Sequence, residues 1–110
     1  MITIMFRVTI KPGREDECAA LLKDVTASTR AEDDGCINYT FFRRGDDPRQ
    51  LVLLEQWRDQ PSLIAHLERL QRVFGPVDDQ EDVPHRRRLP KAFLALFEPG
   101  TEAIRYDVVE

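Results

Sequence analysis

The sequence predicts an α+β domain in which helices cover one face of a four-stranded antiparallel sheet. Alternating apolar segments and segments with helical periodicity follow one another in the order β-α-β-β-α-(α)-β. The chain has 110 residues, close to the commonest domain size, so we expect residues 1–110 to form a single domain. Hydrophobic residues make up 42% and charged residues 33%, which is the balance of a globular protein.

Four segments read as strands bounded by turn residues, and in the first of them apolar and polar side chains alternate. These segments are residues 2–10, 36–43, 50–58 and 103–109. The stretch Gly45-Asp46-Asp47-Pro48 separates the second segment from the third and has the composition of a turn. We therefore expect these two strands to form a hairpin.

Three segments repeat apolar side chains at helical spacing, namely residues 14–30, 61–74 and 91–97. The first helix should end before Asp34-Gly35, because glycine readily adopts the left-handed conformation that closes many helices. Residues 76–90 carry an acidic block followed by a basic block. We expect a solvated loop there, and the alternative is a lid or a partner-contact loop. This element order is that of the ferredoxin-like split βαβ fold.

Both faces of the predicted sheet carry apolar side chains. The third strand places Leu51, Leu53 and Trp57 on one side and Val52 and Leu54 on the other. The second strand places Ile37, Tyr39 and Phe41 on one side and Phe42 on the other. Because the helices cover only one face, the apolar open face favours a homodimer in which a second copy covers it. The alternative is a monomer in which residues 76–98 wrap over the open face.

Composition and motifs exclude several function classes. A net charge of −4 argues against general nucleic-acid binding. Motifs for dinucleotides, phosphates, zinc proteases and haem attachment are absent, and Cys18 and Cys36 form no metal-binding or disulfide pattern, so we expect no cofactor and no metal. No apolar run is long enough to span a membrane, and the first residues alternate as a strand rather than as a signal peptide. We therefore expect a cytoplasmic protein.

Several segments resemble the antibiotic biosynthesis monooxygenase family. They are Arg30-Ala-Glu-Asp-Asp-Gly-Cys-Ile-Asn-Tyr, Leu51-Val-Leu-Leu-Glu-Gln-Trp-Arg-Asp, Ser62-Leu-Ile-Ala-His-Leu, Ala92-Phe-Leu-Ala-Leu and Ile104-Arg-Tyr-Asp-Val-Val. Residues 71–88 look like an insertion. The resemblance implies a dimeric α+β barrel with a pocket between sheet and helices in each subunit. It also implies oxidation of aromatic hydroquinones or anthrones to quinones with dioxygen, without metal or flavin.

An oxygenase of this kind needs a substrate that supplies the electrons and an apolar slot with a few polar groups. His66 is the candidate general base, and the alternative is a structural histidine that is hydrogen-bonded to the backbone or to a carboxylate such as Glu55. Trp57 is a candidate to stack on the ligand or to bind a carbonyl oxygen through its indole N–H, or else it packs in the core. Asn38 is a candidate to stabilise an oxyanion, although its strand parity can direct it to the dimer interface.

Tyr39, Phe42 and Phe93 complete the predicted site as substrate-binding residues. The expected partners are therefore a second copy of the chain, a small aromatic substrate and dioxygen. The run Arg86-Arg87-Arg88 is either a solvated patch or a contact for an anionic ligand.

Two alternatives stay open beside the oxygenase. Haem-degrading relatives carry an asparagine in the first strand, whereas the first asparagine here is Asn38, which disfavours haem binding or degradation. The other alternative is a non-catalytic domain that binds a small molecule or serves assembly, since a fold alone does not fix a function.

Overall fold

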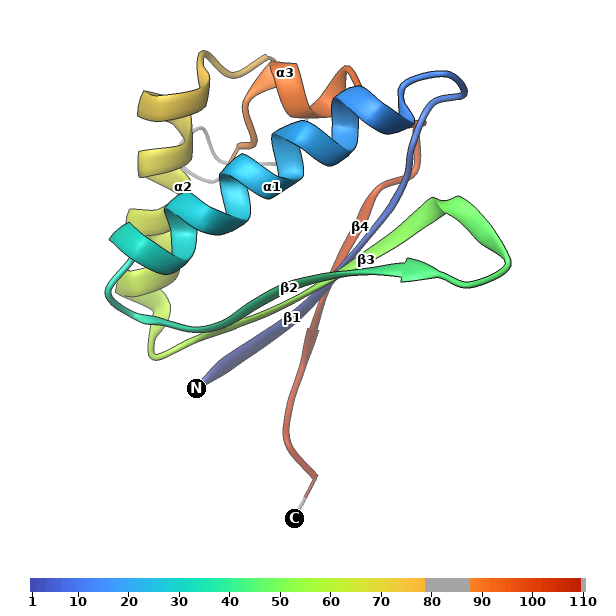
Figure 1. Cartoon of the computed structure of the whole chain (residues 1–110). Coiled ribbons are helices and arrows are strands. Elements are labelled where there is room, and N and C mark those ends of the chain that lie inside the picture. Colours follow the sequence, from blue (N-terminus) through green and yellow to red (C-terminus); the bar gives the residue numbers. More distant parts are fainter. Residues whose placement is uncertain (79–87, 110) are drawn as a thin grey trace.

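The computed structural model of this chain describes residues 1–78 and 88–109 (Figure 1). In this part the elements follow the predicted order. They are β1 (Ile2–Thr9), α1 (Glu15–Glu32), β2 (Cys36–Arg44), β3 (Asp47–Trp57), α2 (Gln60–Phe74), α3 (Lys91–Leu94) and β4 (Glu102–Tyr106). The strands form one antiparallel sheet in the order β2-β3-β1-β4. The predicted ferredoxin-like α+β fold is confirmed.

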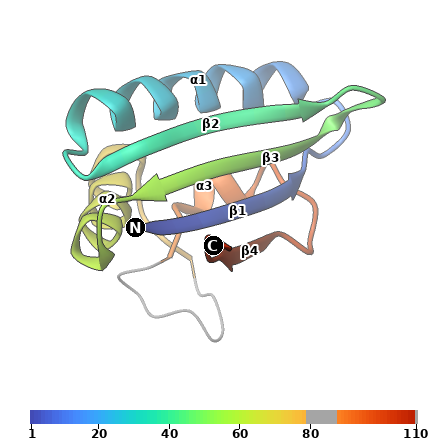
Figure 2. The ribbon, with the colours of Figure 1, turned by 90° about the horizontal axis from the view of Figure 1, so that it is seen from below.

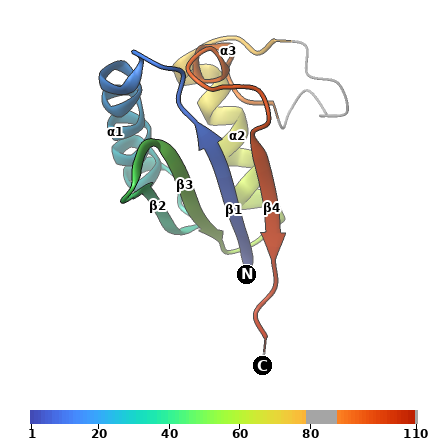
Figure 3. The ribbon, with the colours of Figure 1, turned by 90° about the vertical axis from the view of Figure 1, so that its right-hand side faces the viewer.

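All the described helices lie on the same side of the sheet (Figures 1 and 3). Figure 2 looks onto the opposite side, where the strands lie in front of the helices. The molecule therefore has two layers, and the sheet has one covered face and one open face.

Element boundaries differ from the prediction mainly in the hairpin and in the last helix. β3 begins at Asp47, so the turn between β2 and β3 is shorter than predicted. The helix predicted over residues 91–97 ends at Leu94, because the chain then turns so that Phe97 pairs with Ile10. In the predicted insertion, Gln71–Phe74 belong to α2, whereas residues 79–87, with most of the predicted loop and Arg86-Arg87, lie outside the described residues.

Strand parity predicts the two faces correctly except at Ile37. A β-bulge between Cys36 and Asn38 leaves Ile37 without a partner in the ladder, and its side chain is 55% exposed. Ile37 therefore does not share the covered face with Tyr39, as the simple alternation predicts. Asn38 pairs with Gln56 on the open face, and Tyr39 pairs with Glu55 on the covered face.

The core fills the space between the covered face and the helices. From the sheet it takes Ile2, Val8, Leu53 and Trp57, and from the helices Val25, Leu70 and Phe93. Leu96 and Phe97 join this same core. The described residues 88–98 thus pack on the helix side of the sheet. The monomer alternative requires them to cover the open face instead.

No helix among the described residues is long and apolar enough to cross a membrane. The cytoplasmic location expected from the sequence stays a prediction.

The close approach of Gly35 to α2 yields a stability prediction. A Cβ atom placed on Gly35 would overlap the side chain of Ser62, whereas one placed on Gly45 meets nothing within 4 Å. We predict that Gly35→Ala lowers the free energy of unfolding by roughly 1–3 kcal/mol, the usual cost of overpacking. Gly45→Ala, the matched control, should change it by less than about 0.5 kcal/mol. Urea unfolding measures both, and equal stabilities would contradict the close packing of Gly35 on Ser62.

Candidate active site

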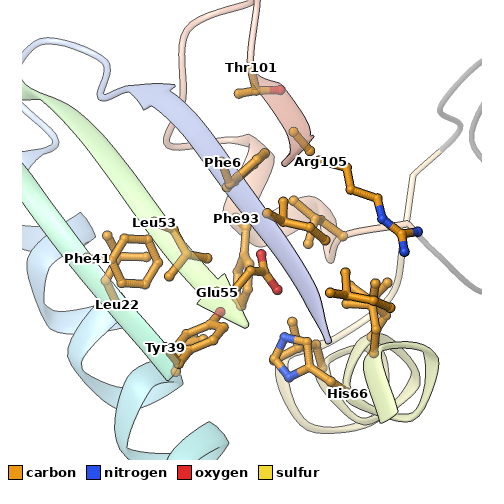
Figure 4. A pocket seen from close by; sticks show the side chains of 18 of the residues that line it. Phe6, Leu22, Tyr39, Phe41, Leu53, Glu55, His66, Phe93, Thr101 and Arg105 are labelled. Carbon is orange, nitrogen blue, oxygen red and sulfur yellow. The ribbon is translucent and has the colours of Figure 1, made fainter. Parts of the chain in front are cut away.

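A cavity of about 500 Å³ lies between the covered face of the sheet and the helices. Most of its wall is apolar, and aromatic rings line it from several elements: Phe6 on β1, Tyr39 and Phe41 on β2, and Phe93 and Phe97 from the region of α3 (Figure 4). This volume is that of pockets which bind small organic molecules. Its apolar lining suits a flat, apolar ring system.

Few polar side chains reach this cavity. Tyr39, Glu55 and His66 project into it at the end where β2, β3 and α2 meet (Figure 4). Thr101 and Arg105 line it from the β4 side. A mostly apolar cavity with a few convergent polar groups is the usual form of a small-molecule site.

His66 is held by a buried carboxylate. Its Nδ1 lies 2.6 Å from Oδ2 of Asp33, and both side chains are almost fully buried. The guanidinium of Arg69 donates to both oxygens of the same carboxylate, through Nε to Oδ1 at 2.7 Å and through Nη2 to Oδ2 at 2.9 Å. Arg69 is itself anchored by a donation from Nη1 to the Ser28 hydroxyl at 2.8 Å.

Local sequence explains how these three groups meet. Asp33 is the C-cap residue of α1, and its backbone N–H donates to the carbonyl of Thr29. His66 and Arg69 are three residues apart on α2, so they lie one above the other on one helix face. The N-terminus of α2 is fixed by Asp59, whose side chain accepts from the Ser62 backbone N–H at 2.9 Å.

The Asp33 carboxylate stays ionised at neutral pH. Burial raises its pKa, but the hydrogen bonds and charges of His66 and Arg69 outweigh burial and lower the pKa to about 2. An ionised carboxylate can only accept, so Nδ1 of His66 is the donor in this pair. The remaining ring nitrogen, Nε2, is then the one that can accept a proton or a hydrogen bond at the cavity.

Glu55 lies in the opposite electrostatic situation. Burial raises its pKa, although the Trp57 indole N–H, which donates to Oε1 at 2.8 Å, and the neighbouring His66 lower it in part. Trp57 also packs against His66, with ring centroids 4.5 Å apart. Burial likewise raises the pKa of Tyr39 well above its usual range, so its hydroxyl remains a donor.

The site therefore combines a positioned imidazole, a carboxyl group whose pKa burial raises, and a phenol. Within the described residues, no group of His, Cys, Asp and Glu side chains could hold a metal ion.

Comparison with known proteins identifies the family of this chain. The family model of the antibiotic biosynthesis monooxygenases matches residues 1–72. The chain belongs to this family. A crystal structure of an antibiotic biosynthesis monooxygenase superimposes with a TM-score of 0.75 at 23% sequence identity, and each chain is covered completely.

Two curated relatives of this family member match it over shorter regions. The Bacillus subtilis protein named "Putative monooxygenase YcnE" is 26% identical over 68 residues, which cover 62% of this chain and 70% of the relative. The Synechocystis protein sll1783 is 27% identical over 67 residues, which cover 61% of this chain. That region spans only 45% of the length of the Synechocystis protein.

The structure brings together four of the six site residues that the sequence suggests. His66, Tyr39 and Phe93 line the cavity, and fully buried Trp57 lies behind His66 with its N–H already bonded to Glu55. The other two lie elsewhere. Asn38 is on the open face, where its Oδ1 accepts from the Thr40 hydroxyl at 2.7 Å, and Phe42, which pairs with Val52, is 52% exposed on the same face.

The partner of His66 is not the one the sequence suggests. Glu55 is buried and bonds to Trp57, whereas His66 bonds to Asp33. Sequence reasoning missed Asp33 and Arg69. The available signal was the spacing of His66 and Arg69, because two basic groups one turn apart on a largely buried face require an acid nearby.

The buried carboxylate yields a pH-dependent stability prediction. The folded-state pKa of Asp33 is about 2, below the unfolded value of about 4. The contribution of Asp33 to the free energy of unfolding is therefore complete above about pH 4 and is lost as the pH falls through about 2. We predict that Asp33→Asn lowers the free energy of unfolding at neutral pH by roughly 2 kcal/mol or more, since Arg69 also loses its partner.

Urea unfolding between neutral pH and about pH 2 tests this prediction. The difference in stability between the wild type and Asp33→Asn should shrink toward the acid end. Asp34→Asn is the matched control, because the Asp34 side chain is fully exposed. A difference that does not change with pH would contradict the low pKa of Asp33.

Proposed function

We propose that this chain is a cofactor-independent monooxygenase that oxidises an anthrone or hydroquinone-type aromatic to a quinone with dioxygen. The observation that carries the proposal is the imidazole of His66, held by Asp33 at one end of a buried cavity lined with aromatic rings. Membership of the antibiotic biosynthesis monooxygenase family supports the same reaction class.

The proposed reaction begins with a proton transfer. Nε2 of His66 takes a proton from the phenol or from the activated C–H of the substrate, and Asp33 stabilises the imidazolium that forms. The hydroxyl of Tyr39, and the carboxyl of Glu55 when it is protonated, then donate hydrogen bonds to the substrate oxygen as negative charge develops on it. Trp57 orients Glu55 through its N–H, and Phe93 packs against the flat ring.

The substrate anion supplies the electrons. It passes one electron to dioxygen, and the two radicals combine to form a C–O bond and a hydroperoxide. Loss of water from the hydroperoxide breaks the O–O bond and leaves the carbonyl of the quinone. For an anthrone, the CH₂ group and O₂ thus become C=O and H₂O. The apolar walls assist because they exclude water from the anion.

Turnover with anthrone tests this reaction. We predict that the purified protein converts anthrone to anthraquinone only when dioxygen is present, and that isotopically labelled dioxygen leaves one atom in the quinone and the other in water. Absorbance and mass spectrometry measure the two results. Equal turnover with and without dioxygen would exclude the mechanism.

The role of His66 yields a second kinetic prediction. His66→Gln should lower kcat by roughly 10²-fold or more, because the general base is lost while the cavity is kept. Arg72→Gln, on the exposed side of the same helix, is the matched control and should retain wild-type kcat. Steady-state rates on anthrone measure both, and a His66→Gln enzyme with unchanged kcat would remove the base from the proposal.

We also propose that the active form is a homodimer in which the open faces of two sheets pack together. Apolar side chains gather on that face from all four strands: Met5, Phe42, Val52, Leu54, Ile104 and Tyr106. Phe42 and Tyr106 are about half exposed in the single chain, at 52% and 49%. A second copy of the same face would remove these side chains from water. Asn38, on the same face, would then lie at the interface.

Sedimentation tests the dimer. The wild type should sediment at twice the chain mass of 12.8 kDa, and Leu54→Glu should sediment as a monomer because it places a charge in the apolar interface. Val73→Glu is the matched control, since Val73 is exposed on α2, away from the open face. A wild type that remains monomeric at micromolar concentrations would contradict the proposal.

A further inference from the structure

Arg105 is the residue of this cavity that the proposed reaction leaves without a role. It lies on β4 and lines the cavity from the β4 side, where its guanidinium extends past the apolar side chains (Figure 4). It is the only lysine or arginine among the described residues that line the cavity. Arg105 is exposed to solvent, so it stands at the mouth of a cavity whose remaining wall is mostly apolar.

The register of the sheet relates Arg105 to the reactive end of the cavity. Ile4 on β1 pairs with Glu55 on one side and with Arg105 on the other. The three residues therefore stand in one row across the covered face. Neighbouring strands are about 4.8 Å apart, so the backbone at Arg105 is roughly 10 Å from the backbone at Glu55.

Arg105 is also free to bind an anion. Some arginines among the described residues pair with carboxylates, as Arg69 does with Asp33 and Arg44 with Asp46. No such ion pair involves Arg105 in the part of the chain that the structure describes. An arginine has a planar fork of donors that matches a carboxylate.

We propose that the substrate is an aromatic acid, whose carboxylate binds Arg105 while the oxidised ring lies between His66, Glu55 and Phe93. The separation across β1 fits a ring system of two or three fused rings that carries the acid at the end remote from the reacting carbon. This inference rests on the oxygenase proposal for the orientation of the substrate, with its reacting ring at His66. Its central claim, that Arg105 binds the carboxylate, concerns binding alone. Arg105 is thus a specificity-determining residue.

Equilibrium binding tests the claim without turnover. The probes are an anthraquinone carboxylate and the matched neutral hydroxymethyl anthraquinone, and the readout is quenching of Trp57, the single tryptophan of the chain. The wild type should bind the acid at least about tenfold more tightly than the neutral probe, and added salt should reduce this preference. Arg105→Gln should abolish the preference, and Arg105→Lys should keep part of it.

Arg44→Gln is the matched control, because it removes the same charge at the hairpin, away from the cavity, and should keep the preference. Equal affinities of the wild type for both probes, no binding of either probe, or a preference that survives in Arg105→Gln would each overturn the inference. These outcomes differ from failure of the oxygenase proposal. A protein that oxidises anthrone but shows no preference for the acid refutes only the role of Arg105, and a protein that prefers the acid but consumes no dioxygen refutes only the reaction.

Discussion

The carboxylate of Asp33, buried between His66 and Arg69, is the interaction on which the rest of the site depends. An ionised carboxylate that leaves water loses several kcal/mol of hydration, and only charged, well-placed donors compensate that loss. Arg69 supplies the compensating charge, and His66 completes the set. The same group joins the end of α1 to the middle of α2, so the wall of the cavity and the orientation of the imidazole have one common cause.

Two carboxyl groups of this site have pKa values that move in opposite directions. The partners of Asp33 lower its pKa to about 2, whereas burial raises that of Glu55, whose hydrogen-bond partner, Trp57, is uncharged. Asp33 is therefore an acceptor that fixes the tautomer of His66, whereas burial shifts Glu55 toward its protonated form. Such separated carboxyl groups are a general means by which proteins assign acid and base roles. The Trp57 and His66 rings lie between them.

Periodicity explains why the sequence predicts the faces of strands and helices correctly. Alternation placed Leu53 and Leu54 on opposite faces, and helical spacing placed Leu63 and Leu70 in the core, because each pattern repeats within a few residues. The pair between His66 and Asp33 joins residues 33 positions apart, and no local pattern encodes such a distance. The bulge at Ile37 was missed for a related reason, since one extra residue in a strand has no signature in alternation.

The cavity and the open face are built from the same strands. Beyond the bulge at Ile37 the ladder of β2 is regular, so Asn38 turns to the open face while Tyr39 turns into the cavity. Along β3, Leu53 and Glu55 line the cavity while Val52 and Leu54 face outward. Any shift of register by one residue would exchange the two sets and place Glu55 on the open face. Packing on the open face and the geometry of the cavity are therefore constrained by one register, so a change that disturbs either face acts on the other through the shared backbone.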